Sequence, residues 1–252
     1  MHVRKISVAL FVCAIAMMVA AKPAAAACSN ATLKGVYGYY HGRPGGGSTI
    51  KAVVGQFTAD GAGNLTASWT LSANGVISTG TTTGTYSISK NCTGTITFSS
   101  EDYSPADFSF VFDDGFEGFQ MIQTDSETAQ TGFGLAQGAG VTCGLIGKAQ
   151  TYAVNLAGLL YPSLDIDIIV GHLTADGKGN LMGSETSSVD GVISMASVTG
   201  TYTENADCTG TAQITPVGST TMNFNTVLVN EGKEQLLIET DSNTLVAGTA
   251  QE

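Results

Sequence analysis

The sequence predicts an all-β fold built from two tandem modules, each an antiparallel up-and-down β-barrel of about eight strands. Three observations predict it. A long segment occurs twice, apolar and polar residues alternate along extended runs, and Asp-Gly or Asn-Gly pairs separate those runs. A pair of β-sandwiches is the alternative architecture, because both folds join short antiparallel strands by tight turns.

The duplication is visible in matching blocks of sequence. Gly55-Gln-Phe-Thr-Ala-Asp-Gly-Ala-Gly-Asn-Leu65 recurs as Gly171-His-Leu-Thr-Ala-Asp-Gly-Lys-Gly-Asn-Leu181, and Cys92-Thr-Gly-Thr95 recurs as Cys208-Thr-Gly-Thr211. Both pairs of blocks are offset by 116 residues, since residue 55 matches 171 and residue 92 matches 208. This period exceeds the roughly 20–50 residues of solenoid repeats, so the chain contains a duplicated domain.

Alternation and turn residues place the strands of the first copy. Asp60-Gly61 and Asn74-Gly75 supply the positive φ of tight hairpin turns, and no further carboxylates accompany them as in an EF-hand loop. Thr85–Ser89 alternates polar and apolar residues, as a half-buried strand does. The second copy repeats the pattern. The predicted strands are 33–41, 50–59, 64–72, 76–80 continuing to 84–89, 93–100, 107–113, 117–124 and 131–137.

The first residues are typical of a secretory signal peptide. Arg4 and Lys5 precede the uncharged, mostly apolar run Ile6–Ala21, and the small residues Ala24–Ala27 follow. The run is too short for a stable membrane span, and no later segment approaches that length. We therefore expect a signal peptide over 1–27, no transmembrane span in the mature chain, and a secreted or periplasmic location.

The mature chain divides into two predicted modules, 28–138 and 143–252, with a Gly-rich linker near 137–142. Four cysteines fall at equivalent positions of the two copies. Such placement in an exported chain predicts one disulfide within each module. The alternative of a lipidated Cys28 would leave its counterpart in the same module unpaired. The predicted pairs are Cys28–Cys92 and Cys143–Cys208.

The charge balance restricts the partners. The formal net charge is -11. Loss of the leader removes three basic residues and makes the chain still more acidic. Such a chain repels phosphate groups, which argues against nucleic acid and anionic membranes as partners.

Few groups are available for chemistry. The sequence has no Gly-x-Ser-x-Gly motif and no phosphate-binding loop, so no catalytic residue is predicted and an enzyme is the less favoured class. His41 and His172 lie apart from other metal ligands, so no metal site and no cofactor are predicted. Asp165 and Asp167 alternate with isoleucines, and we interpret both carboxylates as surface charge.

The two copies differ most in their aromatic residues, which are concentrated in the first copy. These rings have two interpretations: they fill the core of the first module, or they line a pocket for a small ligand. The candidate ligand-binding residues are Tyr37, Tyr39, Trp69, Phe108, Phe110 and Phe112.

The Gly-x-Phe-Thr-Ala-Asp-Gly-x-Gly-Asn and Gly-Thr-Tyr…Cys-Thr-Gly-Thr blocks resemble those of a group of secreted bacterial proteins with no assigned activity. The resemblance covers nearly the whole mature chain and implies a β-barrel-like module without catalytic residues. Two functions stay open. One is an exported, non-enzymatic binding module that takes a small apolar or glycan ligand in the first module. The alternative is a structural or adhesive surface protein that self-associates.

Overall fold

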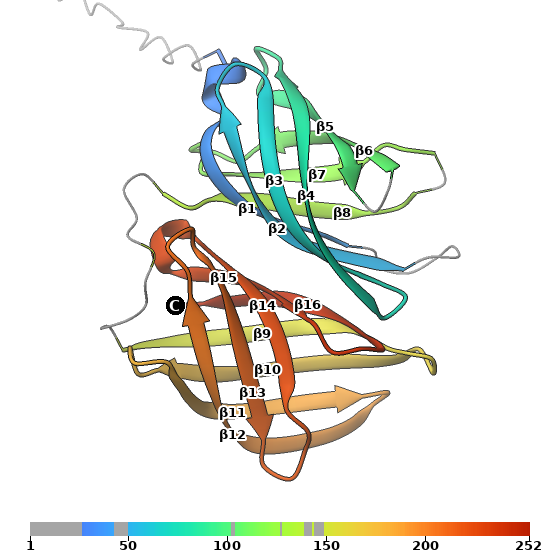
Figure 1. The fold of residues 1–252 in the computed structure, drawn as a ribbon, viewed down its shortest axis with the longest axis vertical. Helices are drawn as coiled ribbons and strands as arrows, with labels where there is room; N and C mark the ends of the chain where they lie inside the picture. The colour runs from blue at the N-terminus through green and yellow to red at the C-terminus, as the bar shows by residue number, and fades with distance from the viewer. Residues whose placement is uncertain (1–26, 43–49, 102–103, 127, 139–142, 144–148) are drawn as a thin grey trace, which may run out of the picture.

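The structure, a computed structural model, describes residues 27–42, 50–101, 104–126, 128–138, 143 and 149–252. They form two closed barrels of eight antiparallel strands, one after the other along the chain (Figure 1). The predicted all-β fold with two tandem up-and-down barrels is confirmed, and the sandwich alternative is wrong. The predicted leader and most of the predicted linker lie outside the described residues.

Barrel 1 follows the predicted strands closely, and the short 3-10 helix η1 (Asn30–Thr32) precedes it. Several of its described hairpins turn at Gly or Asn residues with positive φ, among them Gly61, Asn74, Gly75 and Gly115, because these residues tolerate that conformation. Its strands are β1 (Lys34–Gly42), β2 (Lys51–Asp60), β3 (Asn64–Ala73), β4 (Val76–Ile88), β5 (Thr93–Glu101), β6 (Ser104–Phe112), β7 (Gly118–Gln123) and β8 (Thr131–Ala136).

Barrel 2 repeats this order, and the short 3-10 helix η2 (Asn230–Gly232) lies between its sixth and seventh strands. Its strands are β9 (Gln150–Leu160), β10 (Asp165–Ala175), β11 (Asn180–Val189), β12 (Val192–Glu204), β13 (Thr209–Pro216), β14 (Met222–Val229), β15 (Glu234–Glu239) and β16 (Thr244–Gln251).

The two barrels close in the same register. β1 pairs with β2 and β8, and β9 pairs with β10 and β16. Tyr39 lies opposite Gly55 in barrel 1, and Val154 lies opposite Gly171 in barrel 2. Positions from β2 onward therefore correspond to barrel 2 positions at the offset of 116 that the sequence blocks show. This correspondence allows the two interiors to be compared residue by residue.

The duplicated Asp-Gly loops are held by their own aspartates. Asp60 Oδ1 accepts hydrogen bonds from the backbone N–H groups of Ala62, Gly63 and Asn64, and Oδ2 accepts one from Asn64 Nδ2. These donors lower the pKa of Asp60 to about 2. Asp176 accepts three equivalent bonds in barrel 2, from the backbone N–H groups of Lys178 and Asn180 and from Asn180 Nδ2. Turn formation therefore accounts for these residues, as the sequence predicts.

One disulfide ties each barrel to the segment before its first strand. Cys28 is bonded to Cys92, and Cys143 is bonded to Cys208. The Cα–Cα separations are 5.0 and 4.9 Å. Both pairs agree with the prediction from sequence. Because disulfides persist in oxidising compartments, the pairs are compatible with a protein outside the cytoplasm.

The interiors are filled differently. Barrel 1 contains many rings, and Tyr39, Phe57, Phe98, Phe108 and Phe119 are its largest fully buried side chains. Barrel 2 is built mainly from aliphatic residues, with Phe224 as the ring that matches Phe108.

The disulfide of barrel 1 closes a loop of 64 residues, so we expect it to stabilise the barrel by restricting the unfolded chain. Replacing Cys28 and Cys92 together by serine should lower the free energy of unfolding of barrel 1 by about 4 kcal/mol. Denaturant titration of the oxidised mature protein and the variant measures the difference. An unchanged midpoint would contradict the expected contribution.

Candidate functional site

The six predicted ligand-binding residues all lie in the interior of barrel 1, on β1, β3 and β6. Five are buried in the core, and Trp69 is partly buried against it. The indole packs beside Gly80, where an added Cβ would lie 2.5 Å from Trp69 Cζ2. The structure therefore brings the predicted residues together.

The rings of barrel 1 pack on one another. Ring centroids lie 5.4 Å apart for Tyr39 and Phe98, 5.1 Å for Phe110 and Phe119, and 5.4 Å for Phe110 and Phe112. Offset and edge-to-face pairs at such distances are favourable packing. This arrangement corresponds to the core-filling interpretation of the aromatic residues.

His41 belongs to this packed interior. Its Nδ1 lies 2.8 Å from Gln130 Oε1, and its ring meets Phe108 edge-on at 4.9 Å between centroids. His172 is exposed instead, with its Nδ1 3.2 Å from Ser184 Oγ on the outside of barrel 2. The two histidines therefore serve neither a common site nor equivalent positions.

A more open interior occurs in barrel 2. Thr226, Leu228 and Gln235 stand where barrel 1 has Phe110, Phe112 and Phe119, and they border a cavity of about 30 Å³. A space of this size holds a water molecule or two rather than a larger ligand. Comparing the two copies position by position would have predicted this loss of aromatic volume.

The interpretation of Asp167 as surface charge is wrong. Its side chain points into barrel 2 and is 8% exposed, whereas Ile166 and Ile168 on either side point outward. The sequence predicts the alternation correctly, but the prediction assigns the wrong face of the strand to the interior. The outward isoleucines belong to a surface described below.

Asp167 takes part in an acid cluster, defined here as Asp167, Glu185, Glu239 and Asp241. Asp167 and Glu239 lie near the end of barrel 2 where β10 begins and β15 ends, and Glu185 lies farther inside, opposite Gly171 in the middle of β11. Glu239 is 4% exposed. Burial, the charges of Asp241 and Asp167, and a hydrogen bond with Asp241 raise the pKa of Glu239 to about 8. Burial and then the charge of Asp167 raise the pKa of Glu185, and burial raises that of Asp167. Acids are therefore concentrated where their ionisation is costly.

The two barrels are joined by an apolar interface. It packs the outward side of β1, β2 and β8 of barrel 1 against β14, β15 and β16 of barrel 2 (Figure 1). Hydrogen bonds flank it: Ser72 Oγ donates to Thr244 O at 2.6 Å, and Tyr161 Oη donates to Asn74 Oδ1 at 3.0 Å. Its buried residues are Ala52, Val54, Val227, Val229, Leu236, Ile238, Leu245 and Ala247.

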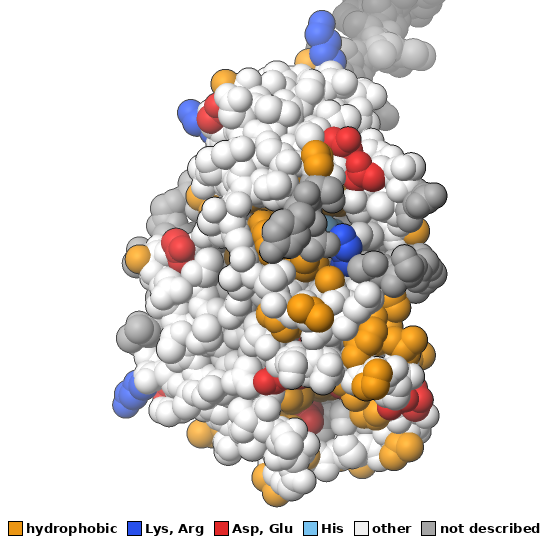
Figure 2. All heavy atoms as spheres, turned by 45° about the vertical axis from the view of Figure 1, so that its right-hand side comes forward, with side chains coloured by type: hydrophobic (Ala, Val, Ile, Leu, Met, Phe, Trp, Pro, Cys, Tyr) orange, Lys and Arg blue, Asp and Glu red, His pale blue; other side chains and the backbone are white. Residues whose placement is uncertain are grey.

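Barrel 2 exposes the counterpart of the surface by which barrel 1 docks. Ile166, Ile168 and Val170 correspond to Ile50, Ala52 and Val54, but they are 54%, 44% and 47% exposed. Figure 2 shows hydrophobic side chains gathered on one side of the lower barrel. We define the open face of barrel 2 as Ile166, Ile168, Val170, Ile193 and Met195.

The open face continues the interface of the two barrels. Across the sheet, Ala247 of the interface lies opposite Ala157, which lies opposite Ile168. Ile168 then lies opposite Ser188, and Ser188 opposite Ile193. The outward positions of the described strands β9 to β12 carry no Asp, Glu, Lys or Arg. An uncharged apolar strip therefore runs outward from the existing interface.

Glu239 should make barrel 2 less stable as the pH rises. Its pKa is about 8 in the folded chain against an ordinary pKa of 4.5 for a glutamate, so the folded state holds a proton that the unfolded state releases. Stability should fall between about pH 4.5 and pH 8. Glu239→Gln introduces the residue that barrel 1 has at the equivalent position, Gln123. It should raise the free energy of unfolding at pH 8 by about 1–3 kcal/mol and have little effect at pH 4.5.

Denaturant titrations at the two pH values measure this difference. Glu252→Gln is the matched control, because that carboxylate is exposed at the other end of the barrel. A gain of the same size at both pH values would contradict the role of the Glu239 proton.

No model of a protein family matches the chain, and a search of curated proteins finds no match. Within the described residues, no three His, Cys, Asp or Glu side chains are grouped so that they could hold a metal ion. The helices of the same part of the chain are all too short or too polar to cross a membrane. The open face and the acid cluster are therefore the features from which function must be argued.

Proposed function

We propose that the protein is an exported structural protein whose copies associate in pairs through the open face of barrel 2. The observation that supports the proposal is the exposure of Ile166, Ile168 and Val170. Of their counterparts in barrel 1, Ala52 and Val54 are buried and Ile50 is partly buried against the other barrel. Removing apolar sheet surface of this kind from water lowers the free energy and favours association.

Charge favours a second copy as the occupant. The chain has a net charge of -11, so two copies repel each other over most of their surfaces. The open face and the strands around it carry no outward ionised side chain, and contact there avoids this repulsion. The leader-like first residues and the two disulfides support association outside the cytoplasm.

A two-fold contact is favoured over a head-to-tail chain. In a head-to-tail chain, the open face would pack on the part of barrel 1 that corresponds to β14 and β15. There, Asp113 and Gln120 replace the buried Val229 and Leu236. Packing apolar residues there would remove water from the Gln120 amide and from the Asp113 carboxylate, of which Oδ1 accepts a hydrogen bond from Gly118 N. The five residues of the open face include no carboxylate and no amide side chain, and an isologous contact of two such faces closes as a dimer.

The small-ligand function predicted for barrel 1 would require its core to rearrange. A ligand would have to displace rings that already pack on one another, such as Phe98 and Phe108. If it binds there, the fluorescence of Trp69 should change in a saturable way during titration with an apolar ligand or an oligosaccharide. An unchanged spectrum across such a panel would argue against this function.

The proposed dimer is tested by sedimentation velocity of the mature protein over a concentration series up to about 100 µM. We expect a concentration-dependent dimer that persists at high salt, because the contact is apolar. Ile168→Asp and Met195→Lys should each shift the protein to monomer by weakening association at least about 100-fold, since the two-fold axis introduces each charge twice.

Ile122→Asp is the matched control, because Ile122 is exposed on β7 of barrel 1, at the surface a head-to-tail contact would use. It should leave the dimer intact. A wild-type protein that is monomeric at every concentration, or a dimer unaffected by both open-face variants, would contradict the proposal. Loss of the dimer in Ile122→Asp alone would show head-to-tail association instead.

A further inference from the structure

A groove of about 390 Å³ lies beside the apolar interface, between β2, β3 and β4 of barrel 1 and β13 and β14 of barrel 2. Val54 and Val227 connect the groove with the interface, because both border it and both are buried between the barrels. Sites for small molecules occur preferentially at such junctions, in spaces of roughly 300–1,000 Å³. The groove therefore has room for a ligand, and neither barrel forms it alone.

Hydrogen bonds hold the two walls of the groove in place. Asn225 Nδ2 of barrel 2 donates to Thr70 Oγ1 of barrel 1 at 2.9 Å, and Thr70 is 7% exposed. On the side of barrel 1, Gln137 Nε2 donates to Gln56 Oε1 at 3.0 Å. The carbonyl oxygen of Gln137 accepts a hydrogen bond from the backbone N–H of Glu231 at 3.1 Å. The walls are therefore fixed relative to each other by contacts of the chain itself.

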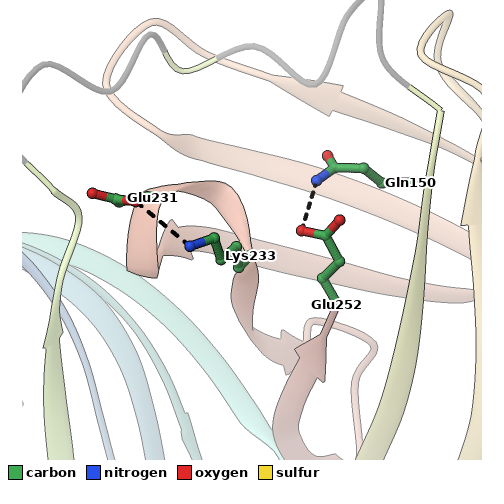
Figure 3. A network of polar contacts seen from close by, with 4 residues as sticks. All are labelled: Gln150, Glu231, Lys233 and Glu252. Carbon is green, nitrogen blue, oxygen red and sulfur yellow. Dashed lines mark hydrogen bonds and ion pairs between the residues drawn. The ribbon is translucent and has the colours of Figure 1, made fainter.

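The described side chains that line the groove are all uncharged. The helix η2, which contacts the segment after β8, carries an ion pair in which Lys233 Nζ lies 3.6 Å from Glu231 Oε2 (Figure 3). Asp207 lies beside the groove, and hydrogen bonds lower its pKa, chiefly from Thr209 and to a smaller extent from Gln56. Its carboxylate is thus ionised and already bonded, which disfavours an anion without creating a cation site. The lining favours a neutral ligand.

The wall on barrel 1 presents hydroxyl groups to the groove. Ser68 on β3 lies opposite Thr81 on β4, and Thr79 lies two residues before Thr81 on the same strand. The three side chains make no hydrogen bond to any residue that the structure describes. Since each hydroxyl group can both donate and accept, this wall can bind a ligand that carries hydroxyl groups of its own.

The amide side chains of the groove are absent from the shared scaffold. They are Gln56, Asn205 and Asn225. An amide supplies an acceptor and two donors in one plane, so it can bond to neighbouring hydroxyl groups of one ligand. The other copy of the module has no amide at any of the three equivalent positions, which are those of His172, Ser89 and Ser109. These amides therefore belong to the groove and not to the duplicated fold.

The groove continues onto the outside of barrel 1. A second hollow of about 640 Å³ shares Gln56, Ser68 and Thr81 with it and extends over β2 to β5. Further hydroxyl groups border this hollow, among them those of Thr58 and Thr83. A surface of this length is suited to a chain of several hydroxyl-rich units rather than to one unit.

We propose that the groove between the barrels binds a neutral, linear oligosaccharide. Hydroxyl groups of β3 and β4 on one wall, and the amides of Asn205 and Asn225 on the other, bond to the hydroxyl groups of the sugar rings. Val54 and Val227 form the apolar floor beneath the C–H groups of the rings. The site lies on the outside of both barrels, so it is separate from the aromatic interior of barrel 1 and from the open face.

Calorimetric titration of the mature protein tests the proposal, with maltohexaose, cellohexaose and N-acetylated chitohexaose as neutral probes at up to about 2 mM. We expect saturable binding of at least one probe, with the same affinity at low and high salt because no ionised group takes part. Hexagalacturonate is of similar length but carries a carboxylate on each ring, and it should not bind. Absence of binding by all three neutral probes, or equal binding of hexagalacturonate, would overturn the proposal.

A variant of barrel 1 locates the first wall. Thr79→Val and Thr81→Val combined remove two hydroxyl groups with little change of shape and should weaken binding at least about tenfold. Thr85→Val is the matched control, because Thr85 points outward from the same strand and borders neither the groove nor the second hollow. It should leave the affinity unchanged. Equal effects of the variant and the control would overturn the location.

A variant of barrel 2 tests the second wall. Asn205→Ser introduces the residue that barrel 1 has at the equivalent position, and Asn205 Nδ2 bonds to Thr209 of its own barrel. The contact between the barrels therefore stays intact, and binding should weaken at least about threefold. Gln213→Ser removes an exposed amide of β13 outside the groove and should have no effect. Unchanged binding by Asn205→Ser would overturn the participation of barrel 2.

Discussion

Closure of each sheet on itself is the constraint on which the rest of the structure depends. Because β1 pairs with β8 and β9 pairs with β16, each strand position faces either a narrow interior or the outside. Barrel 1 fills its interior with rings. Barrel 2 has the same strand order with smaller side chains, and it contains cavities and buried acids instead. One scaffold thus holds two different interiors.

The fold could be predicted from sequence because its signals are local or repeated. The Asp-Gly loops recur because Asp60 and Asp176 each satisfy several backbone N–H groups of their own turn. The cysteines occur at equivalent positions, so each half suggested the pairing in the other. The aromatic residues predicted as a group do lie together. Sequence left open whether they enclose space or fill it, since that depends on how side chains from different strands interdigitate.

The acid cluster was missed for a physical reason. Asp165 to Val170 alternates cleanly, and alternation normally places the apolar set toward the core. That rule assumes that one face of the strand meets water. In β2 the outward residues Ala52 and Val54 are buried by the second barrel, so apolar residues mark an interface rather than the interior. The same pattern was kept in β10, where nothing in the described chain covers it. Aligning Lys51 with Asp167 reinforces the error, because a charged residue at the same position of both copies suggests a solvated face.

The connection between β8 and β9 gives the two kinds of contact different behaviour. Inside the chain, barrel 1 meets barrel 2 at a high effective concentration, because a short stretch of polypeptide holds them together. The interface between the two barrels of one chain therefore forms at any protein concentration. The open face has similar apolar residues, but no covalent link holds a second copy beside it. In the proposed dimer, the fraction of open faces that are covered therefore depends on protein concentration. The same type of surface is therefore a permanent contact within one molecule and, in the dimer that we propose, a dilution-sensitive contact between molecules.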